Sequence, residues 1–230
     1  KESWYQLKLA AHYELEQFPR ATDTLEIMIA RWPGRKIYWT QLSQVCFRLE
    51  QDDRALAVQA LAYRNGLLDQ QADLLYLSSL YSHSQVPYKA ADVLQAGIES
   101  GVVEASKAHW TVVAESWYAA EELEKSLLAY ERAGKAADDG DIDLRRGYIL
   151  VDMERWPDAL GSLDRALQKG GLDERQTAEV YLLRGITQFN LGNFEKAGSD
   201  WARASQYDKT REAARQWINH LEEERRRRAS

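Results

Sequence analysis

Small side chains recur along the chain at intervals of 33 to 38 residues. The recurring positions are Ala21, Ala55, Ala90, Ser126, Ala159 and Ala197. Between them, apolar residues follow the spacing of amphipathic helices, and no stretch alternates as a strand would. A period of this length is typical of stacked units that each contain two helices.

Two other positions keep the same period. Four residues after each small residue the side chain is large, as in Leu25, Gln59, Leu94, Tyr130, Leu163 and Trp201. Twelve residues before it stand Leu9, Ser43, Ser78, Ala114, Gly147 and Gly185, of which five are small. We predict that the small residues mark points where two helices cross closely, so that a Leu there would overpack the joint and cost ~1–3 kcal/mol.

Proline and glycine punctuate the same units. Proline precedes the recurring small residue by two or three positions at Pro19, Pro87 and Pro157, which predicts the first turn of the second helix. Glycine followed by apolar residues ends the second helix at Gly66, Gly101 and Gly170. This order is typical of a left-handed glycine cap with a hydrophobic contact behind it.

The pattern predicts an all-α fold, a right-handed α-solenoid of helix-turn-helix repeats in a single domain over residues 1–230. The units are expected at residues 2–34, 36–69, 71–105, 107–139, 140–175 and 178–210. Residues 211–228 are expected to form a C-terminal capping helix, because Ala214, Trp217, Ile218 and Leu221 make one apolar stripe.

Net charge, apolar run length and cysteine content disfavour or exclude several kinds of partner and structure. The net charge is -6 and the pI about 5.4, which disfavours non-specific binding to nucleic acid or to anionic lipid. The apolar runs are far shorter than the ~20 residues of a membrane span. Cys46, the single cysteine, excludes an internal disulfide and is predicted to be a buried packing residue.

We predict no catalytic, cofactor or metal site. The metalloprotease, phosphate-loop and serine-hydrolase motifs are missing, and His12, His83, His109 and His220 lie in separate repeats. An enzyme that uses the region of His83 stays as a remote alternative. The basic run Arg225–Arg228 is expected to be a frayed, solvated tail, and its alternative role is contact with an acidic partner or a membrane surface.

A partner-binding groove is expected on the inner face, which the first helix of each unit lines. The predicted groove residues are Tyr13, Thr40, Gln44, Phe47, Arg48, Ser79, His83, Glu115, Tyr118 and Tyr148. Aromatic anchors there would hold an extended peptide, while Gln44, Ser79 and Glu115 would meet its backbone. For Tyr148 and Phe189, filling of the space between repeats is an equal alternative.

The offsets of large aromatic, small and large residues resemble the tetratricopeptide repeat. Beyond this repeat, four stretches are similar to the bacterial tetratricopeptide proteins encoded beside TonB, ExbB and ExbD. They read YWTQLSQVCFRLEQDDRALAVQALAYRNGLL, VPYKAADVLQAGIESGVVE, RWPDALGSLDRALQKGGL and AARQWINHLEEE. The resemblance implies a non-enzymatic accessory of TonB-dependent uptake that contacts a component of the transducing complex, and it carries over no catalytic or ligand residue.

We therefore expect a protein-interaction scaffold that binds a protein or peptide segment, with TonB, ExbB or ExbD as candidate partners. The resemblance implies a location in the periplasm or at its membranes, and a cytoplasmic location is left open because the sequence starts at Lys1 without Met. The alternative function is a periplasmic assembly chaperone or envelope-biogenesis factor. Exposed aromatic faces could also support self-association.

Overall fold

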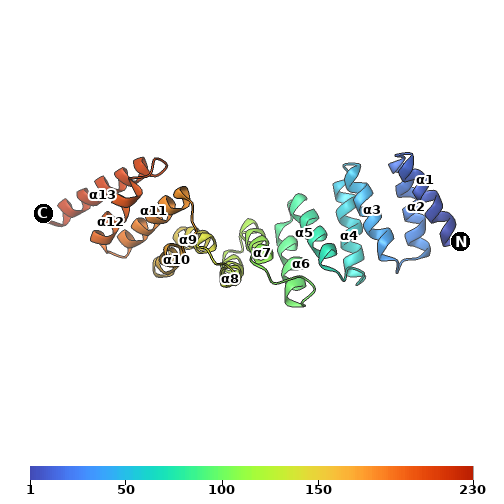
Figure 1. Ribbon diagram of the computed structural model, residues 1–230, viewed down its shortest axis with the longest axis horizontal. Coiled ribbons are helices and arrows are strands. Elements are labelled where there is room, and N and C mark those ends of the chain that lie inside the picture. The colour runs from blue at the N-terminus through green and yellow to red at the C-terminus, as the bar shows by residue number, and fades with distance from the viewer. Residues whose placement is uncertain (230) are drawn as a thin grey trace. The chain divides into compact units, whose positions relative to one another are not determined.

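The computed structural model describes residues 1–229, and within that range the chain forms thirteen α-helices and no strand (Figure 1). The all-α prediction is confirmed. The helices are α1 (Glu2–Glu14), α2 (Phe18–Arg31), α3 (Lys36–Arg48), α4 (Asp52–Arg64), α5 (Gln71–His83), α6 (Pro87–Glu99), α7 (Lys107–Ala119), α8 (Leu123–Lys135), α9 (Asp141–Asp152), α10 (Trp156–Lys169), α11 (Glu174–Asn190), α12 (Phe194–Ala204) and α13 (Arg211–Ala229).

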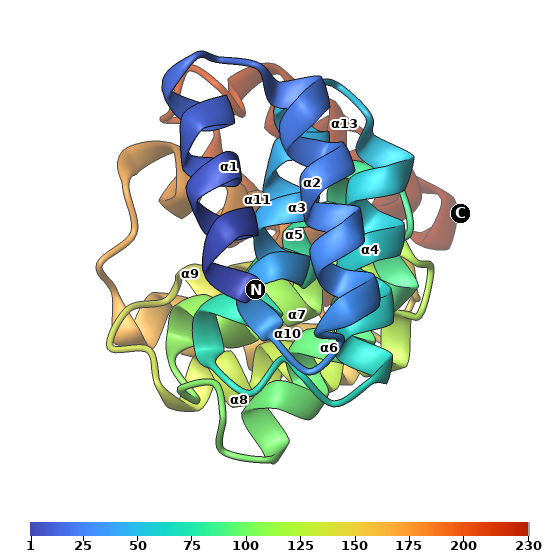
Figure 2. The ribbon, with the colours of Figure 1, turned by 90° about the vertical axis from the view of Figure 1, so that its right-hand side faces the viewer.

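The chain divides into two compact units, each of which is described by itself. The first unit holds residues 1–105 and 119–121, and the second holds residues 106–118 and 122 onward. In the first unit each helix from α1 to α6 packs on the next, and Figure 2 shows α1 beside α2 at the N-terminal end. The second unit continues this order from α8 to α13. Packing between neighbours along the chain is typical of helical repeats.

The recurring small residues lie where the two helices of a pair meet. All six, from Ala21 to Ala197, are fully buried. The partner residue twelve positions earlier is equally constrained, because a Cβ on Gly185 would lie 2.3 Å from the Trp201 indole nitrogen. The prediction of close helix contacts at these positions is confirmed.

A left-handed residue joins the two helices of every pair. It stands five positions before the small residue and is Glu16, Glu50, Gln85, Glu121, Glu154 or Gly192, with φ between 52° and 78°. The next residue donates its amide back to the end of the first helix, as Gln51 does to the Cys46 carbonyl at 2.9 Å. This is the hydrogen bond of a helix C-cap, and only glycine adopts the required φ without strain.

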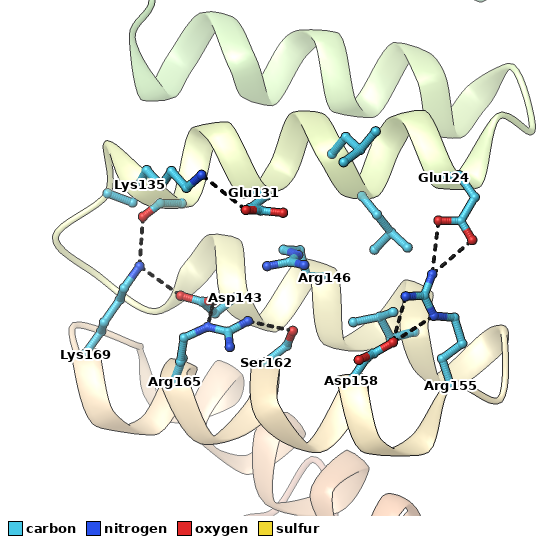
Figure 3. A pocket seen from close by; sticks show the side chains of 15 residues that line it. Glu124, Glu131, Lys135, Asp143, Arg146, Arg155, Asp158, Ser162, Arg165 and Lys169 are labelled. Carbon is cyan, nitrogen blue, oxygen red and sulfur yellow. Dashed lines mark hydrogen bonds and ion pairs between the residues drawn. The ribbon is translucent and has the colours of Figure 1, made fainter.

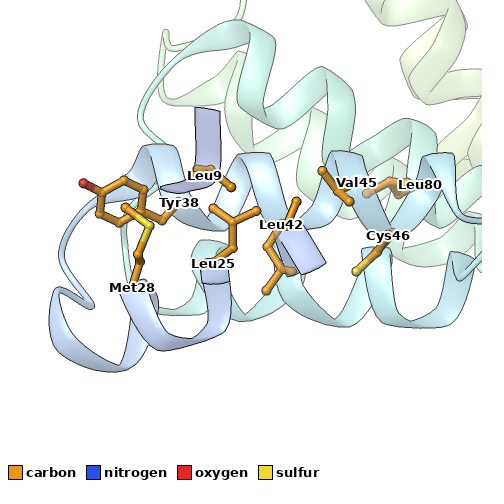
Figure 4. Close-up of a cluster of buried hydrophobic side chains, with 10 residues drawn as sticks. Leu9, Leu25, Met28, Tyr38, Leu42, Val45, Cys46 and Leu80 are labelled. Atoms are coloured by element: carbon orange, nitrogen blue, oxygen red, sulfur yellow. The ribbon is translucent and has the colours of Figure 1, made fainter. Parts of the chain in front are cut away.

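Each unit has its own hydrophobic core. In the first unit, Leu25, Leu42, Cys46 and Leu80 are buried together (Figure 4). The burial raises the pKa of the Cys46 thiol, which keeps it protonated and confirms its packing role. The left-handed glycine caps are also confirmed, since Gly66 has a φ of 69°.

The last helix covers the end of the second unit. Leu221 is buried with Trp201, and the rings of Trp201 and Trp217 stack at 5.2 Å, which confirms the capping role of the apolar stripe. The expectation of a frayed tail is wrong for residues 225–227, which continue α13; Arg225 forms an ion pair with Glu195 at 2.6 Å. The Arg228 side chain lies outside the described residues.

Candidate functional site

A shallow cavity lies on the first unit between α1 and α3. Its volume is about 370 Å³, and it is lined by Gln6, Leu9, Ala10, Tyr13, Ile37, Tyr38 and Gln41. The Tyr38 hydroxyl donates to Glu2 at 2.5 Å and accepts from the Gln6 amide at 3.1 Å. Burial, followed by the hydrogen bond to Glu2, raises the pKa of Tyr38. None of the described residues that line the cavity is charged, and the Tyr38 hydroxyl and the Gln6 amide are already hydrogen-bonded. The cavity therefore suits an apolar side chain.

An exposed aromatic pair lies further along the same set of helices. The Phe47 ring on α3 is 41% exposed and meets the His83 ring of α5 edge-on at 5.4 Å. The His83 Nε2 lies 2.9 Å from a carboxylate oxygen of Asp52, at the start of α4. Asp52 therefore fixes the imidazole against Phe47. The sequence pattern pointed to both rings but missed Asp52.

Two other predicted groove residues converge on Phe18 of α2. The Arg48 guanidinium lies 4.2 Å from the centre of the Phe18 ring, and the Tyr13 ring meets Phe18 at 6.3 Å. Cation–π contact and edge-to-face packing hold both side chains. Burial raises the pKa of Tyr13. The sequence analysis did not include Phe18 because it lies on α2, the second helix of its pair, and only first helices were projected onto the groove.

The remaining predicted residues of the first unit are polar. Thr40 is half-buried, and its hydroxyl donates to the Lys36 carbonyl at 3.4 Å. The Ser79 hydroxyl donates to the Tyr76 carbonyl of its own helix at 2.8 Å, whereas Gln44 is exposed. Of these three side chains, the exposed Gln44 amide is best placed to meet a peptide backbone.

The second unit carries the other three predicted residues, Glu115, Tyr118 and Tyr148. Glu115 accepts from Arg145 at 2.6 Å, and this ion pair occupies the carboxylate that was expected to meet a peptide. Tyr118 and Tyr148 are exposed on α7 and α9. Partial burial, followed by the hydrogen bond to the Glu179 carboxylate, raises the pKa of Tyr148. Phe189 instead packs on Phe194, Trp201 and Trp217 as a filler between helices.

Within residues 1–229 no group of three or more His, Cys, Asp and Glu side chains is placed to bind a metal ion. His83 and Asp52 form a hydrogen-bonded pair. The single thiol of the sequence, Cys46, is buried. None of the helices described here combines the length and the apolar character needed to cross a bilayer.

Comparison with known proteins agrees with the repeat geometry. Residues 144–219 match the family model described as tetratricopeptide repeat. The chain is similar to the crystal structure of YrrB, "a TPR protein with an unusual peptide-binding site", with a TM-score of 0.60, 15% identity, and coverage of 86% of this chain and 100% of that one. It is also similar to the MamA protein, with a TM-score of 0.57, 13% identity, and coverage of 77% and 94%.

No curated protein matches the sequence. At these identities the likeness to YrrB and MamA is one of fold. The chain thus has the fold of tetratricopeptide-repeat proteins, a class whose members usually bind other proteins rather than catalyse reactions.

Proposed function

We propose that the chain is a non-enzymatic protein-interaction scaffold and that its first unit binds an extended segment of a partner. The observation that carries this proposal is the exposed Phe47 ring held by His83 and Asp52, on the same set of helices as the cavity beside Tyr13. A fixed, exposed aromatic ring loses little entropy on binding and is typical of interface anchors. The peptide-binding site named for YrrB adds support by analogy of fold.

The chemistry of this surface favours a segment with two apolar side chains. One would enter the cavity between α1 and α3, and the other would pack on Phe47. The Gln44 amide and the outward nitrogens of Arg48 would bond the backbone between these anchors. No step of this binding needs a metal ion or cofactor.

Site-specific photocrosslinking tests the proposal. The photoreactive amino acid benzoylphenylalanine is placed at position 47, or at position 61 as a control, because Leu61 on α4 is 45% exposed and thus as accessible as Phe47. A partner should crosslink from position 47 and not from position 61. We refer to Phe47, His83 and Asp52 together as the Phe47 surface. Equal yields at both positions would show that the partner contact is not specific to this surface.

A narrower proposal is that the scaffold serves TonB-dependent uptake from the periplasm. It rests on the wording of residues 38–68, 86–104, 155–172 and 213–224, which resembles the tetratricopeptide proteins encoded beside TonB, ExbB and ExbD. The test is the identity of the protein crosslinked at position 47 in a cell-envelope fraction. TonB, ExbB, ExbD or an outer-membrane receptor supports this role, and an unrelated partner rejects it while leaving the scaffold intact.

The alternative is a periplasmic assembly chaperone, which the exposed apolar side chains Trp4, Leu7 and Ile37 favour. A chaperone should prevent aggregation of several unrelated unfolded proteins at near-equal molar ratio. A scaffold should instead bind one segment saturably and leave aggregation unchanged.

A further inference from the structure

The second unit contains a charged cavity between α8, α9 and α10, with a volume of about 740 Å³ (Figure 3). Its charged lining has one more cation than carboxylate. The cations are Lys135, Arg146, Arg155, Arg165 and Lys169. An excess positive charge in a concave, partly dry site attracts an anion.

Four of these cations are already neutralised within the cavity. The ion pairs include Lys135 with Glu131 at 3.2 Å, Arg155 with Asp158 at 2.6 Å, and both Arg165 and Lys169 with Asp143 at 2.9 Å. Asp143 is nearly fully buried, and its two cations compensate its charge. These four cations are therefore engaged in ion pairs within the protein and are not the groups expected to bind an added anion.

Arg146 is the exception. Its Nε is buried without a hydrogen-bond partner, and no ion pair joins its guanidinium to any side chain that the structure describes. Figure 3 shows it in the middle of the cavity, between α8 and α10, with no partner drawn. Burial, followed by the charge of the nearby Arg165, lowers the pKa of Arg146, although the carboxylates of Glu131, Asp143 and Asp158 act in the opposite direction. A partly buried guanidinium whose Nε lacks a hydrogen bond is costly, and a bound anion that accepts from this Nε would remove part of the cost.

We infer that this cavity binds a carboxylate side chain of a partner protein, presented next to an apolar residue. One excess positive charge matches a monoanion, whereas a phosphate dianion would leave the site negative. The apolar part of the lining is Leu127, Leu128, Ala137 and Leu150, of which Leu128 is 61% exposed and the other three are buried. The single excess positive charge and this apolar lining together match an acidic residue flanked by leucine-like side chains.

Within the second unit, the cavity lies on a different side of α9 from Tyr148, the predicted groove residue of this helix. Arg146 and Tyr148 lie two residues apart on α9, so their side chains point about 200° apart around the helix axis. The cavity is therefore on the side of α9 that α8 and α10 flank. A partner bound there would leave Tyr148 accessible.

Two blocked pentapeptides test the inference by NMR titration of the full chain. The probe is acetyl-Ala-Leu-Glu-Leu-Ala-amide, and its matched control replaces the Glu by Gln. The Glu peptide should shift the methyl signals of Leu127, Leu128 and Leu150 saturably, and the Gln peptide should bind about ten-fold more weakly or worse, because it lacks the charge-assisted hydrogen bonds. Equal binding of both peptides, no saturable shift, or tighter binding of inorganic phosphate would overturn the inference.

Variants of neighbouring arginines locate the anion. Arg146→Gln should abolish the preference for the Glu peptide, because it removes the guanidinium whose Nε is free to donate to the anion. Arg145→Gln removes the same charge one residue away, on a side chain that pairs with Glu115, and should keep the preference. If Arg146→Gln stays folded and still prefers the Glu peptide, Arg146 is not the anion-binding group.

Discussion

The Ser43 hydroxyl donates a hydrogen bond to the backbone carbonyl of Ala55 at 2.8 Å, where α3 and α4 meet. Ser78 bonds Ala90 in the same way at 2.9 Å, and in the next pair the direction reverses, since Ser126 donates to Ala114 at 2.8 Å. The residues of each pair are twelve positions apart and fully or almost fully buried. A small polar residue at this joint thus permits close approach and also ties the two backbones together.

Replacing Ser43 by Ala should lower the free energy of unfolding by ~1 kcal/mol, because the hydroxyl bond is lost while the joint keeps its shape. Ser79→Ala is the matched control, since the Ser79 hydroxyl is exposed and bonds only its own helix. The control should change stability by less than ~0.5 kcal/mol. Urea unfolding measures both, and equal effects of the two substitutions would contradict the role given to Ser43.

Two glycines should respond in opposite directions to an added methyl group, because Gly185 lies at a close contact between helices and Gly161 does not. Gly185→Ala places a Cβ 2.3 Å from the Trp201 indole nitrogen and should cost ~1–3 kcal/mol through overpacking. Gly161→Ala, inside α10, meets only the end of the Arg165 side chain at 3.7 Å and should gain ~0.5–1 kcal/mol. Thermal unfolding of the two variants decides; a stabilised Gly185→Ala would refute the close contact.

The positions of these joints could be predicted from the sequence because a repeat makes one steric constraint visible six times. Small residues, first-turn prolines and glycine caps all report backbone geometry that few side chains permit. The left-handed turn inside each pair was missed for the opposite reason. Five of its six positions carry Glu or Gln, which have no preference for positive φ, so only the backbone reveals the constraint.

Relieving this strain should stabilise the protein. Glu50 has a φ of 58°, and Glu50→Gly should raise the free energy of unfolding by ~0.5–1 kcal/mol. Gly192 already occupies the equivalent position in the last pair. Ala57→Gly, inside α4, is the control and should cost ~1 kcal/mol, since glycine helps only where φ is positive. A loss of stability in Glu50→Gly would count against the strain.

A second stabilising change concerns Gln59. Its side chain is fully buried, and neither its amide nitrogen nor its oxygen has a hydrogen-bond partner in the described chain. The equivalent position carries Leu25, Leu94 or Leu163 in other pairs. Gln59→Leu should therefore raise stability by ~1–3 kcal/mol.

Gln44→Leu, on an exposed surface of α3, serves as its control and should change stability by less than ~0.5 kcal/mol. Both variants are compared by urea midpoint. If Gln59→Leu is less stable than the native chain, the Gln59 amide has a bonding role that outweighs its burial.

The candidate sites were less predictable than the fold. Helix periodicity placed Phe47, His83 and Arg48 on one surface. It missed Asp52, which contacts His83, and Phe18, which contacts Arg48, because both lie on the second helix of a pair and only first helices were projected. Arg146 could not be found at all from sequence. Its importance depends on which cations nearby are already paired, and this is a property of three helices packed together.

Binding by variants of the Phe47 surface tests the central claim most directly. The partner segment crosslinked at position 47 is synthesised and its Kd measured with the native chain, with the double variant Phe47→Ala/His83→Ala, and with Leu61→Ala. The scaffold account predicts that the double variant binds at least about ten-fold more weakly, as expected for loss of an aromatic anchor, while Leu61→Ala binds as the native chain does. Unchanged affinity in a folded double variant would contradict it.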